Sequence, residues 1–307
     1  MVRSSITEAV VTLGRRYVRS APVSFGKATL AERWLNVRLR DHPRRRVTEV
    51  GFGARFAVDT QDLIQRYLYM FGAWEPHMTR WLESRLAPGD VLVDVGANVG
   101  VFSVLGSRLV GSTGRVVAIE ASPVFHRRVL EHASLNGCDN IRALNTAVSD
   151  ERKTLTFVLA SSNNMGANSI VPYDGPAEST FEIEALPLAD VLRPDEVAKA
   201  RVIKIDVEGA EGGVVRGLAP VLGQLRSDVE IAVEVTPDRM SQLGDDVEEL
   251  LETMRKHGFH MYRLPTDYSA MSYPRAIRHP LPPVRWREPI VGETELIFSR
   301  VDAETLF

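Results

Sequence analysis

The chain has 307 residues, 44% of them hydrophobic and 25% charged, which is the balance of a soluble globular protein with a sizeable core. Cys138 is the only cysteine, which excludes a disulfide framework and a cysteine zinc site and fits a reducing, cytoplasmic environment. No stretch approaches the roughly eighteen consecutive apolar residues of a membrane span, and charges within residues 6–18 disfavour a signal peptide.

The first 46 residues are strongly basic. They contain eleven Lys and Arg against three acids, a balance of +8, whereas the remainder of the chain carries −11. One or two helices, interrupted near residues 22–26, and a hairpin at 47–58 are expected to form an N-terminal extension over residues 1–60. Such a basic arm favours an anionic membrane surface, at the inner membrane face, or an acidic carrier. The alternative, which we favour, is docking on the acidic body of the same chain or of a partner subunit in a homo-oligomer.

Residues 61–307 are expected to form one α/β domain, which begins with a helix capped by Asp59 or Thr60. A second helix leads from there into the first core strand. Between the two helices lie Trp74, Glu75 and His77, at a place that can cover the ligand end of a parallel sheet. They are therefore candidate lid or substrate contacts; the alternative is that Trp74 packs in the core and His77 lies on the surface.

A strand–turn–helix–strand unit at residues 91–120 organises the domain. An apolar strand ends in a glycine-rich turn, a helix begins at once, and a second apolar strand ends on Glu120. Ligands of such a parallel sheet bind at the carboxyl ends of its strands. A dinucleotide fingerprint read from Gly96 would need glycines at positions 98 and 101, where the chain has Asn98 and Val101.

The spacing Asp94-x-Gly96-x-x-x-Gly100 with a later acid is instead the pattern of S-adenosylmethionine (SAM) methyltransferases. The glycines let the backbone approach the methionine half of the cofactor, and Glu120 can accept hydrogen bonds from the ribose hydroxyls. The alternative is a Rossmann-like turn that binds no nucleotide. Asp150 is a candidate for the adenine amine, with turn capping as its alternative. The full set of candidate cofactor-binding residues is Glu75, Asp94, Gly96, Ala97, Asn98, Gly100, Glu120, Ala121, Ser149, Asp150 and Asp206.

The rest of the chain alternates between helical and extended patterns. An inserted β-hairpin is expected from strands at 154–159 and 181–185, around a polar loop at 161–169 that suits a polyhydroxylated acceptor or serves only as a loop. The later core strands are expected at 202–206, 229–235, 259–264 and 295–299, the last two as a closing antiparallel pair. Together with the strands near 91–95, 115–119 and 141–145, they predict a seven-stranded, mostly parallel sheet. The proline- and arginine-rich segment 265–294 is expected to be irregular, and either to border the acceptor site or to be a rigid surface connection.

Four segments together resemble the FkbM-type methyltransferases. They are Asp-Val-Gly-Ala-Asn-Val-Gly at 94–100, Ile-Glu-Ala-Ser-Pro at 119–123, Ala-Val-Ser-Asp at 147–150 and Lys-Ile-Asp-Val-Glu-Gly-Ala-Glu at 204–211. The resemblance runs from about Leu63 to Val235, and the segment 204–211 is its most specific part. Ala121 departs from a frequent proline of the family, which affects the shape of a loop more than the chemistry. The resemblance implies a Rossmann-like class I methyltransferase fold and methyl transfer from SAM, usually to an oxygen of a sugar, polyketide or other small secondary metabolite.

Acids at the ends of two core strands are the candidates for catalysis. A protonated alcohol is a poor nucleophile, so a general base or a metal is needed near the methyl group. Asp206, Glu208, Glu211 and Glu234 are the nearest acids, and crowding of like charges raises a carboxyl pKa. We predict catalytic roles for Asp206, Glu208, Glu234 and Lys204, with Asp206 as the central residue. The alternative is that Asp206, Glu208 and Glu234 hold Mg²⁺.

Other acceptors are disfavoured by what the chain lacks. Methylation of the exocyclic amines of bases usually requires Asn/Asp-Pro-Pro-aromatic after the fourth strand, where the chain has Asp206-Val207-Glu208-Gly209. The acidic catalytic body also disfavours a nucleic-acid partner. A hydroxyl of a sugar, glycolipid or secondary metabolite is therefore the predicted acceptor. The alternative function is a non-catalytic SAM-fold binding or assembly module that acts through the basic arm.

Overall fold

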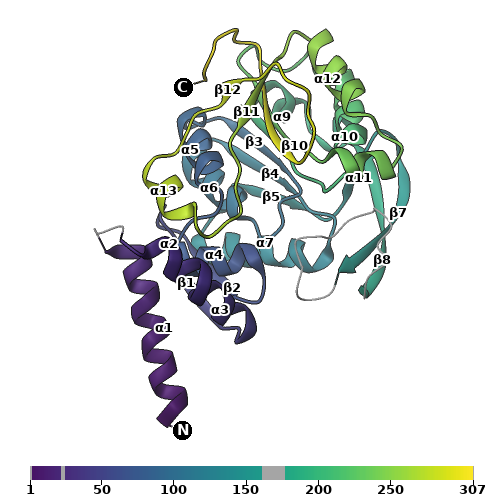
Figure 1. The fold of residues 1–307 in the computed structure, drawn as a ribbon. Coiled ribbons are helices and arrows are strands. Elements are labelled where there is room, and N and C mark those ends of the chain that lie inside the picture. The colour runs from purple at the N-terminus through teal and green to yellow at the C-terminus, as the bar shows by residue number, and fades with distance from the viewer. Residues whose placement is uncertain (1, 22–24, 161–176, 307) are drawn as a thin grey trace.

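A twisted β-sheet runs through the middle of the molecule, with helices on both of its faces (Figure 1). The computed structural model describes residues 2–21, 25–160 and 177–306. Within these residues the sheet has eight strands in the order β12-β11-β13-β10-β9-β3-β4-β5. Their bounds are β3 Val91–Val95, β4 Arg115–Ile119, β5 Ile141–Leu144, β9 Ala200–Ile205, β10 Glu230–Val235, β11 His260–Leu264, β12 Val284–Arg285 and β13 Thr294–Ser299.

The sheet confirms the predicted α/β architecture. Strands β5, β4, β3, β9 and β10 are parallel neighbours, and β13 runs antiparallel to both β10 and β11. These are the seven predicted strands. The eighth strand, β12, is a two-residue pairing on β11 that comes from the segment predicted to be irregular.

Successive side chains of each central strand pack into two hydrophobic layers, one on each face of the sheet. Leu92 and Val116 point into a layer with the helices α4 to α7, whereas Val93 and Val117 point into the opposite layer with α10 and α12. This division follows from the period-two geometry of a strand whose two faces are both covered. The helices of the core are α4 Leu63–Phe71, α5 Pro76–Arg85, α6 Val101–Val110, α7 Pro123–Asn136, α8 Leu188–Val191, α9 Pro194–Lys199, α10 Glu211–Leu218 with a 3₁₀ turn at Ala219–Val221, α11 Pro237–Gln242, α12 Val247–Lys256 and α13 Tyr273–Arg278.

The helix α4 begins later than predicted. Its N-cap is Asp62, whose side chain accepts a hydrogen bond from the Gln65 N–H at 2.9 Å, so the predicted caps Asp59 and Thr60 are wrong. Asp59 instead ends strand β2, and its backbone N–H donates to the Gln65 side chain. The helix ends at Gly72, which has φ +74°, as an αL cap requires.

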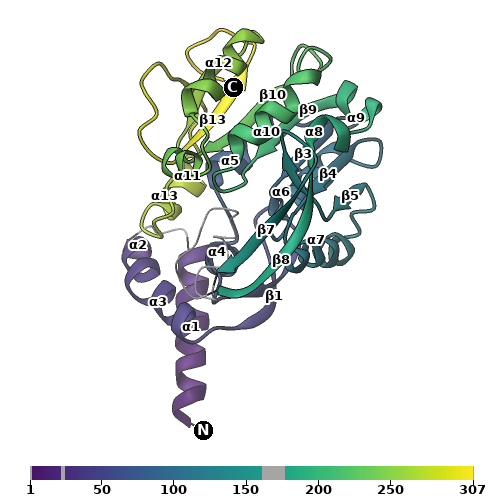
Figure 2. The same ribbon diagram turned by 90° about the vertical axis from the view of Figure 1, so that its right-hand side faces the viewer.

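The N-terminal extension shares the core of the body. It consists of α1 Val2–Ser20, α2 Lys27–Leu30, a π-helical stretch Ala31–Asn36, α3 Val37–Asp41 and the hairpin β1 Arg45–Glu49 and β2 Arg55–Asp59. The predicted helices and hairpin are thus present. Val11 and Val18 of α1 and Leu35 and Leu39 beyond it are buried in the same layer as the sheet residue Leu92. The start of α1 projects from the body in both views (Figures 1 and 2).

A second, three-stranded sheet confirms the predicted insertion. The strands β7 Lys153–Ala160 and β8 Ala177–Pro187 form an antiparallel hairpin, and β6 Ala147–Ser149 adds to β8 in parallel. The hairpin of β7 and β8 lies toward the viewer, near the labels of α4 and α7, in Figure 2. The predicted polar acceptor loop at 161–169 lies outside the described residues. Among the described helices, none combines the length and the apolar character needed to cross a bilayer.

Candidate active site

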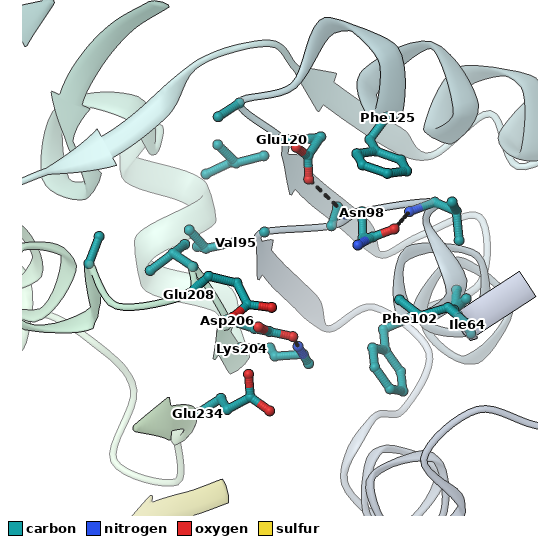
Figure 3. Close-up of a pocket in the computed structure, with 18 of the residues that line it drawn as sticks. Ile64, Val95, Asn98, Phe102, Glu120, Phe125, Lys204, Asp206, Glu208 and Glu234 are labelled. Atoms are coloured by element: carbon teal, nitrogen blue, oxygen red, sulfur yellow. Dashed lines mark hydrogen bonds and ion pairs between the residues drawn. The ribbon is translucent and has the colours of Figure 1, made fainter. Parts of the chain in front are cut away.

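A cavity of about 240 Å³ opens at the carboxyl ends of β3, β4, β9 and β10 (Figure 3). Strand ends of a parallel sheet are where this architecture binds ligands, so the position agrees with the sequence prediction. Of the predicted site residues, Glu75, Gly96, Ala97, Asn98, Glu120, Ala121, Lys204, Asp206, Glu208 and Glu234 line this cavity. Asp94, Gly100, Ser149 and Asp150 do not line it.

The turn after β3 is shaped by Gly96. Its φ is +82°, and the N–H groups of Gly96 and Ala97 both donate to the Ile119 carbonyl at the end of β4, at 2.9 and 3.1 Å. A Cβ on Gly96 would lie 1.7 Å from the carbonyl oxygen of Asp206. The glycine was predicted to make room for the cofactor; in the structure it makes room for the backbone that carries Asp206. It therefore fixes the distance between the turn after β3 and the end of β9.

Glu120 is held in place by two backbone donors. Its Oε2 accepts from the Asn98 N–H and its Oε1 from the Ser122 N–H, both at 2.8 Å. Burial raises the pKa of Glu120 to about 7, although these two donors act against the shift. Each carboxylate oxygen has a second lone pair. The side chain can therefore still accept hydrogen bonds from a diol that lies in the cavity.

Asp94 lies behind the cavity wall. Its Oδ2 accepts from the Ser103 hydroxyl at 2.5 Å, while its Oδ1 is buried and no described residue forms a hydrogen bond with it. Burial raises the pKa of Asp94, with Lys204 acting in the opposite direction. Through the hydrogen bond from Ser103, Asp94 connects the end of β3 to helix α6 and so stabilises the turn between them. A direct contact of Asp94 with the cofactor stays a prediction.

Asp150 forms ion pairs with two cations of the protein. Its carboxylate accepts from the Arg216 guanidinium at 3.0 Å and from the Lys153 ammonium at 3.1 Å. Burial opposes ionisation, but Lys153, Arg216 and the Ser149 hydroxyl outweigh it and lower the pKa of Asp150 well below its usual range. The predicted contact with adenine has no support from this geometry, because Ala147 and Val148 are the residues of this segment that line the cavity.

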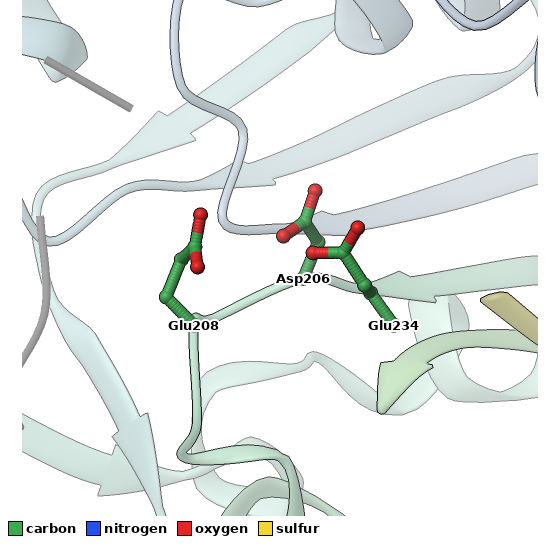
Figure 4. A group of neighbouring side chains, drawn as sticks. All are labelled: Asp206, Glu208 and Glu234. Atoms are coloured by element: carbon green, nitrogen blue, oxygen red, sulfur yellow. The ribbon is translucent and has the colours of Figure 1, made fainter. Parts of the chain in front are cut away.

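Three carboxylates gather at the ends of β9 and β10. Oxygens of Asp206, Glu208 and Glu234, which we name the acid cluster, lie within 4.8 Å of one another (Figure 4). The predicted convergence of these side chains is thus present in the structure. Figure 3 shows the acid cluster at one end of the cavity and Glu120 with Phe125 at the other.

Two cations pair with the acid cluster. The Lys204 ammonium lies 2.7 Å from Asp206 Oδ2, and Arg239 forms an ion pair with Glu208. Burial disfavours both charges of the first pair, but their mutual attraction outweighs it, raising the pKa of Lys204 and lowering that of Asp206. Burial, and then the charge of Asp206, raises the pKa of Glu234. The three oxygens have the spacing of a cation site, yet Lys204 and Arg239 already supply positive charge there.

Tyr268 joins the acid cluster to Glu75. Its hydroxyl lies 2.8 Å from Glu234 Oε1 and 3.3 Å from Glu75 Oε1, and its ring stacks on Trp74 with centroids 5.4 Å apart. Glu75 has the left-handed φ of +39°, and its Oε2 is buried with no hydrogen-bond partner in the part of the chain that the structure describes. Burial raises the pKa of Glu75 to about 7. A strained, buried acid beside a cavity is typical of a functional site.

The segment that carries Trp74 and Glu75 is fixed by the helix that follows it. In α5, the Arg85 guanidinium and the Trp81 indole both donate to Glu230 Oε2 on β10, at 2.8 and 3.0 Å. Trp74 and Glu75 therefore line the cavity as predicted. His77 does not, because its Nδ1 accepts from the Leu281 N–H at 2.8 Å on the other side of the helix.

The end of the cavity near Glu120 is apolar. Ile119, Phe125 and Val148 line it, and the hairpin strand β7 adds Leu155 and Phe157. Phe157 also stacks on Phe181 of β8 with ring centroids 5.5 Å apart. This end suits a flat heterocycle, while the acid cluster at the other end suits a positively charged group and a hydroxyl.

Several lining residues were missed by sequence reasoning. Tyr268 and Arg239 belong to segments that carry no recognisable motif, and Phe157 belongs to the insertion. Alternation along β7 places Leu155 and Phe157 on one face, which could have marked that face as apolar and partly covered. No comparable local signal marks Tyr268.

Comparisons with known proteins agree on one enzyme class. Residues 94–261 match the model of the family described as Methyltransferase FkbM domain. Hexuronic acid methyltransferase AglP of Haloferax volcanii is 25% identical over 221 residues, which cover 71% of this chain and 87% of that protein.

Solved structures include further methyltransferases. Methyltransferase FkbM from Methylobacillus flagellatus KT superposes with a TM-score of 0.41 at 14% identity, over 77% of this chain and 52% of that one. Precorrin-6y C5,15-methyltransferase from Geobacter metallireducens GS-15 gives a TM-score of 0.38 at 14% identity, over 72% of this chain and 87% of that one.

Proposed function

The chain belongs to the FkbM methyltransferase family and is a SAM-dependent methyltransferase, and from this premise we propose that it methylates a hydroxyl oxygen of a sugar-type acceptor. The observation that carries the proposal is the acid cluster at one end of a cavity whose other end has a ribose-binding geometry at Glu120. The two ends lie at the same edge of one sheet, Glu120 after β4 and the acid cluster at β9 and β10, with β3 between β4 and β9.

The residues of the cavity fit SAM. Phe125, Val148 and Phe157 provide an apolar slot for adenine, and Glu120 keeps a free lone pair on each oxygen for the ribose hydroxyls. The buried Glu75 Oε2, which has no hydrogen-bond partner among the described residues, suits a cationic or hydroxyl donor. When bound, SAM supplies an electrophilic methyl group on its sulfonium sulfur.

Asp206 is the proposed acceptor of the hydroxyl proton. The neighbouring Lys204 lowers the pKa of this carboxylate and favours its ionised form, whereas burial and the charge of Asp206 raise the pKa of the adjacent Glu234. The hydroxyl becomes strongly acidic as its oxygen gains the methyl group, so a weak carboxylate base at Asp206 Oδ suffices if it is positioned beforehand. Lys204 and Glu234 orient Asp206 and hold its charge.

The proposed acceptor class is a sugar, and an acidic sugar in particular. The relative in Haloferax volcanii is named for hexuronic acid, and the cavity of this chain also carries Arg239, whose side chain is 36% exposed. A guanidinium is suited to a planar carboxylate. A free sugar, a glycolipid headgroup and a hydroxylated secondary metabolite all offer the required hydroxyl.

The test is a turnover assay with purified enzyme, SAM and a panel of hexuronic acids, their glycosides and matched neutral sugars. We expect Asp206→Asn to lower kcat at least about a hundredfold, as loss of a general base does, with SAM affinity retained. Asn keeps the size of the side chain, and Glu83→Gln, on the exposed face of α5, is the control. Retention of wild-type turnover in Asp206→Asn would contradict the proposed base.

The same assay separates the alternatives. If the acid cluster holds Mg²⁺, EDTA abolishes turnover and added Mg²⁺ restores it, whereas a carboxylate base predicts no effect of EDTA. A non-catalytic SAM-binding module predicts SAM binding by calorimetry without methyl transfer to any member of the panel.

A further inference from the structure

The N-terminal extension exposes large apolar side chains. On α1, Val10 is 45% and Leu13 is 65% exposed, and Phe25, which follows that helix, is 85% exposed. Val37 of α3 is 40% exposed. Val10 and Leu13 are three residues apart and share one side of α1, whereas the buried Val11 and Val18 lie on another side that packs against the body. This helix therefore presents an apolar stripe that no described residue covers.

Some arginines of the extension are used for packing. The Arg15 side chain donates to the Tyr69 carbonyl of the body at 2.6 Å, and its guanidinium lies 4.3 Å from the centroid of the Tyr69 ring. Other contacts hold the extension itself together: Arg15 donates to the Thr48 hydroxyl at 2.8 Å, Arg19 donates to the Glu49 carbonyl, and Arg44 pairs with Glu8 of α1 at 2.8 Å. Arg15 therefore packs α1 against a carbonyl and an aromatic ring of the body, and docking on its acidic groups stays a prediction.

Other arginines face outward. Arg16 of α1 and Arg33 of the π-helical stretch are exposed, and neither has an acidic partner among the described residues. Arg16 is three residues from Leu13, and Arg33 is four residues from Val37, so on each helix a cation adjoins an exposed apolar side chain. We name Val10, Leu13, Arg16, Phe25, Arg33 and Val37 the N-terminal surface.

We propose that the N-terminal surface docks on an anionic lipid bilayer. Apolar side chains that enter the boundary between headgroups and acyl chains, flanked by arginines that meet lipid phosphates, are the two requirements for a helix lying at a membrane interface. The charge of the extension, +8, complements such a membrane, while the remaining −11 of the body is repelled and faces away. The orientation of the enzyme at the membrane follows from this asymmetry.

The competing occupants fit less well. Two copies that met through this surface would bring +8 against +8. A nucleic acid would use the arginines but would leave Leu13 and Phe25 without a function. The body of the same chain packs on α1 through Arg15 and the buried Val11 and Val18, which lie on another side of the helix than Val10 and Leu13.

Docking would place the cavity near the membrane. The helix α1 packs on α4, through Arg15 and Tyr69, and the first residues of α4, Leu63 and Ile64, form part of the cavity wall. An acceptor that is itself attached to a lipid would then reach the active site from the membrane plane. The docking does not depend on the identity of the acceptor.

Vesicle flotation with the full-length protein tests the proposal. We expect the protein to float with vesicles of one part phosphatidylglycerol to two parts phosphatidylcholine, and to remain unbound with phosphatidylcholine alone. Salt at about 0.5 M should weaken the binding, because it screens the arginine contacts. Failure to bind the anionic vesicles, or equal binding to both kinds, would overturn the proposal.

Matched variants locate the contact. Leu13→Asp should lower vesicle partitioning at least about tenfold, and Arg33→Glu at least about fivefold. The controls are Val291→Asp, an 87% exposed valine far along the chain, and Lys256→Glu on α12, whose side chain is 69% exposed; both should bind as the wild type does. Thermal unfolding and SAM binding confirm that each variant is folded. If the controls lose as much binding as the test variants, the contact is not at the N-terminal surface.

Sedimentation equilibrium distinguishes the occupant. Self-association that Leu13→Asp abolishes, together with no vesicle binding, would show that a second copy covers this surface and would overturn the membrane assignment.

Discussion

Gly96→Ala tests the contact on which the geometry of the site depends. The residue has φ +82°, where an alanine costs roughly 1–2 kcal/mol, and its Cβ would lie 1.7 Å from the Asp206 carbonyl oxygen. Both partners are backbone, so the overlap is relieved only by separating the turn after β3 from the end of β9. Overpacking of this kind costs about 1–3 kcal/mol more, so we expect a total loss of about 3 kcal/mol in the free energy of unfolding.

Two other glycines distinguish the cost of backbone strain at positive φ from the cost of the steric overlap of a Cβ. Gly100 has φ +81° and its Cβ would be 3.4 Å from Val129, while Gly137 has φ +63° and nothing within 4 Å of its Cβ. Gly137→Ala should therefore cost only the backbone term, about 1 kcal/mol, and Gly100→Ala slightly more. The difference between Gly96→Ala and Gly137→Ala isolates the contact with Asp206.

Urea denaturation and calorimetry with SAM measure the two consequences. Each tenfold loss of affinity corresponds to about 1.4 kcal/mol. We expect at least that loss in Gly96→Ala, because separating the two segments displaces Asn98, whose N–H holds Glu120. Gly137→Ala should bind SAM as the wild type does. Equal stability of Gly96→Ala and Gly137→Ala, with equal SAM affinity, would refute the reasoning.

Three further predictions concern the buried acids. SAM should bind more tightly at pH 8 than at pH 6, because the pKa of Glu120 is about 7 and only its ionised form offers all its lone pairs to the ribose; calorimetry of Glu120→Gln should show weaker binding without this pH dependence. The ligand-free protein should lose stability as the pH rises from about 5 to 8. Burial raises the pKa of Glu211 to about 7, so over that window the folded state binds more protons than the unfolded state and the slope of stability with pH is negative. Urea denaturation at several pH values should give a smaller slope for Glu211→Gln than for the exposed control Glu248→Gln, and identical slopes would contradict this. Tyr268→Phe should lower kcat about tenfold to a hundredfold, since it leaves two buried carboxyls without their shared hydroxyl, while SAM affinity changes little; loss of SAM binding in steady-state and calorimetric assays would instead place Tyr268 at the cofactor.

Local patterns in the sequence were sufficient for the strands, the turn after β3 and the acids at the strand ends. An apolar run followed by a glycine-rich turn and a helical pattern indicates a strand–turn–helix unit. Alternation along β9 places Lys204 and Asp206 on one side of the strand. Because parallel strands end at one edge of their sheet, Glu120, Asp206 and Glu234 had to lie at that same edge once the sheet was predicted. The fold class and the acid cluster therefore followed from the sequence.

Tertiary contacts decided the identity of the partners. Asp150 follows a strand as a ligand-binding acid would, yet Arg216, 66 residues away, takes its carboxylate. Tyr268 reaches the cavity because Trp74 offers it a stacking surface and Glu234 a hydrogen-bond acceptor, and both lie far from it in the chain. Such pairings depend on loops whose paths are set by packing, and no periodicity in the sequence encodes them.

The extension shows the same division. Composition determined that residues 1–46 are basic, and the residue pattern predicted helices there. Neither determined which arginines are used for packing. Only the structure separates Arg15 and Arg19, which donate to carbonyls of Tyr69 and Glu49, from Arg16 and Arg33, which face outward. Neighbours in the sequence such as Arg15 and Arg16 differ in this way because successive residues of a helix point about 100° apart. The sequence therefore determined the charge of this arm, and the packing of α1 on α4 decided which part of that charge is available to a partner.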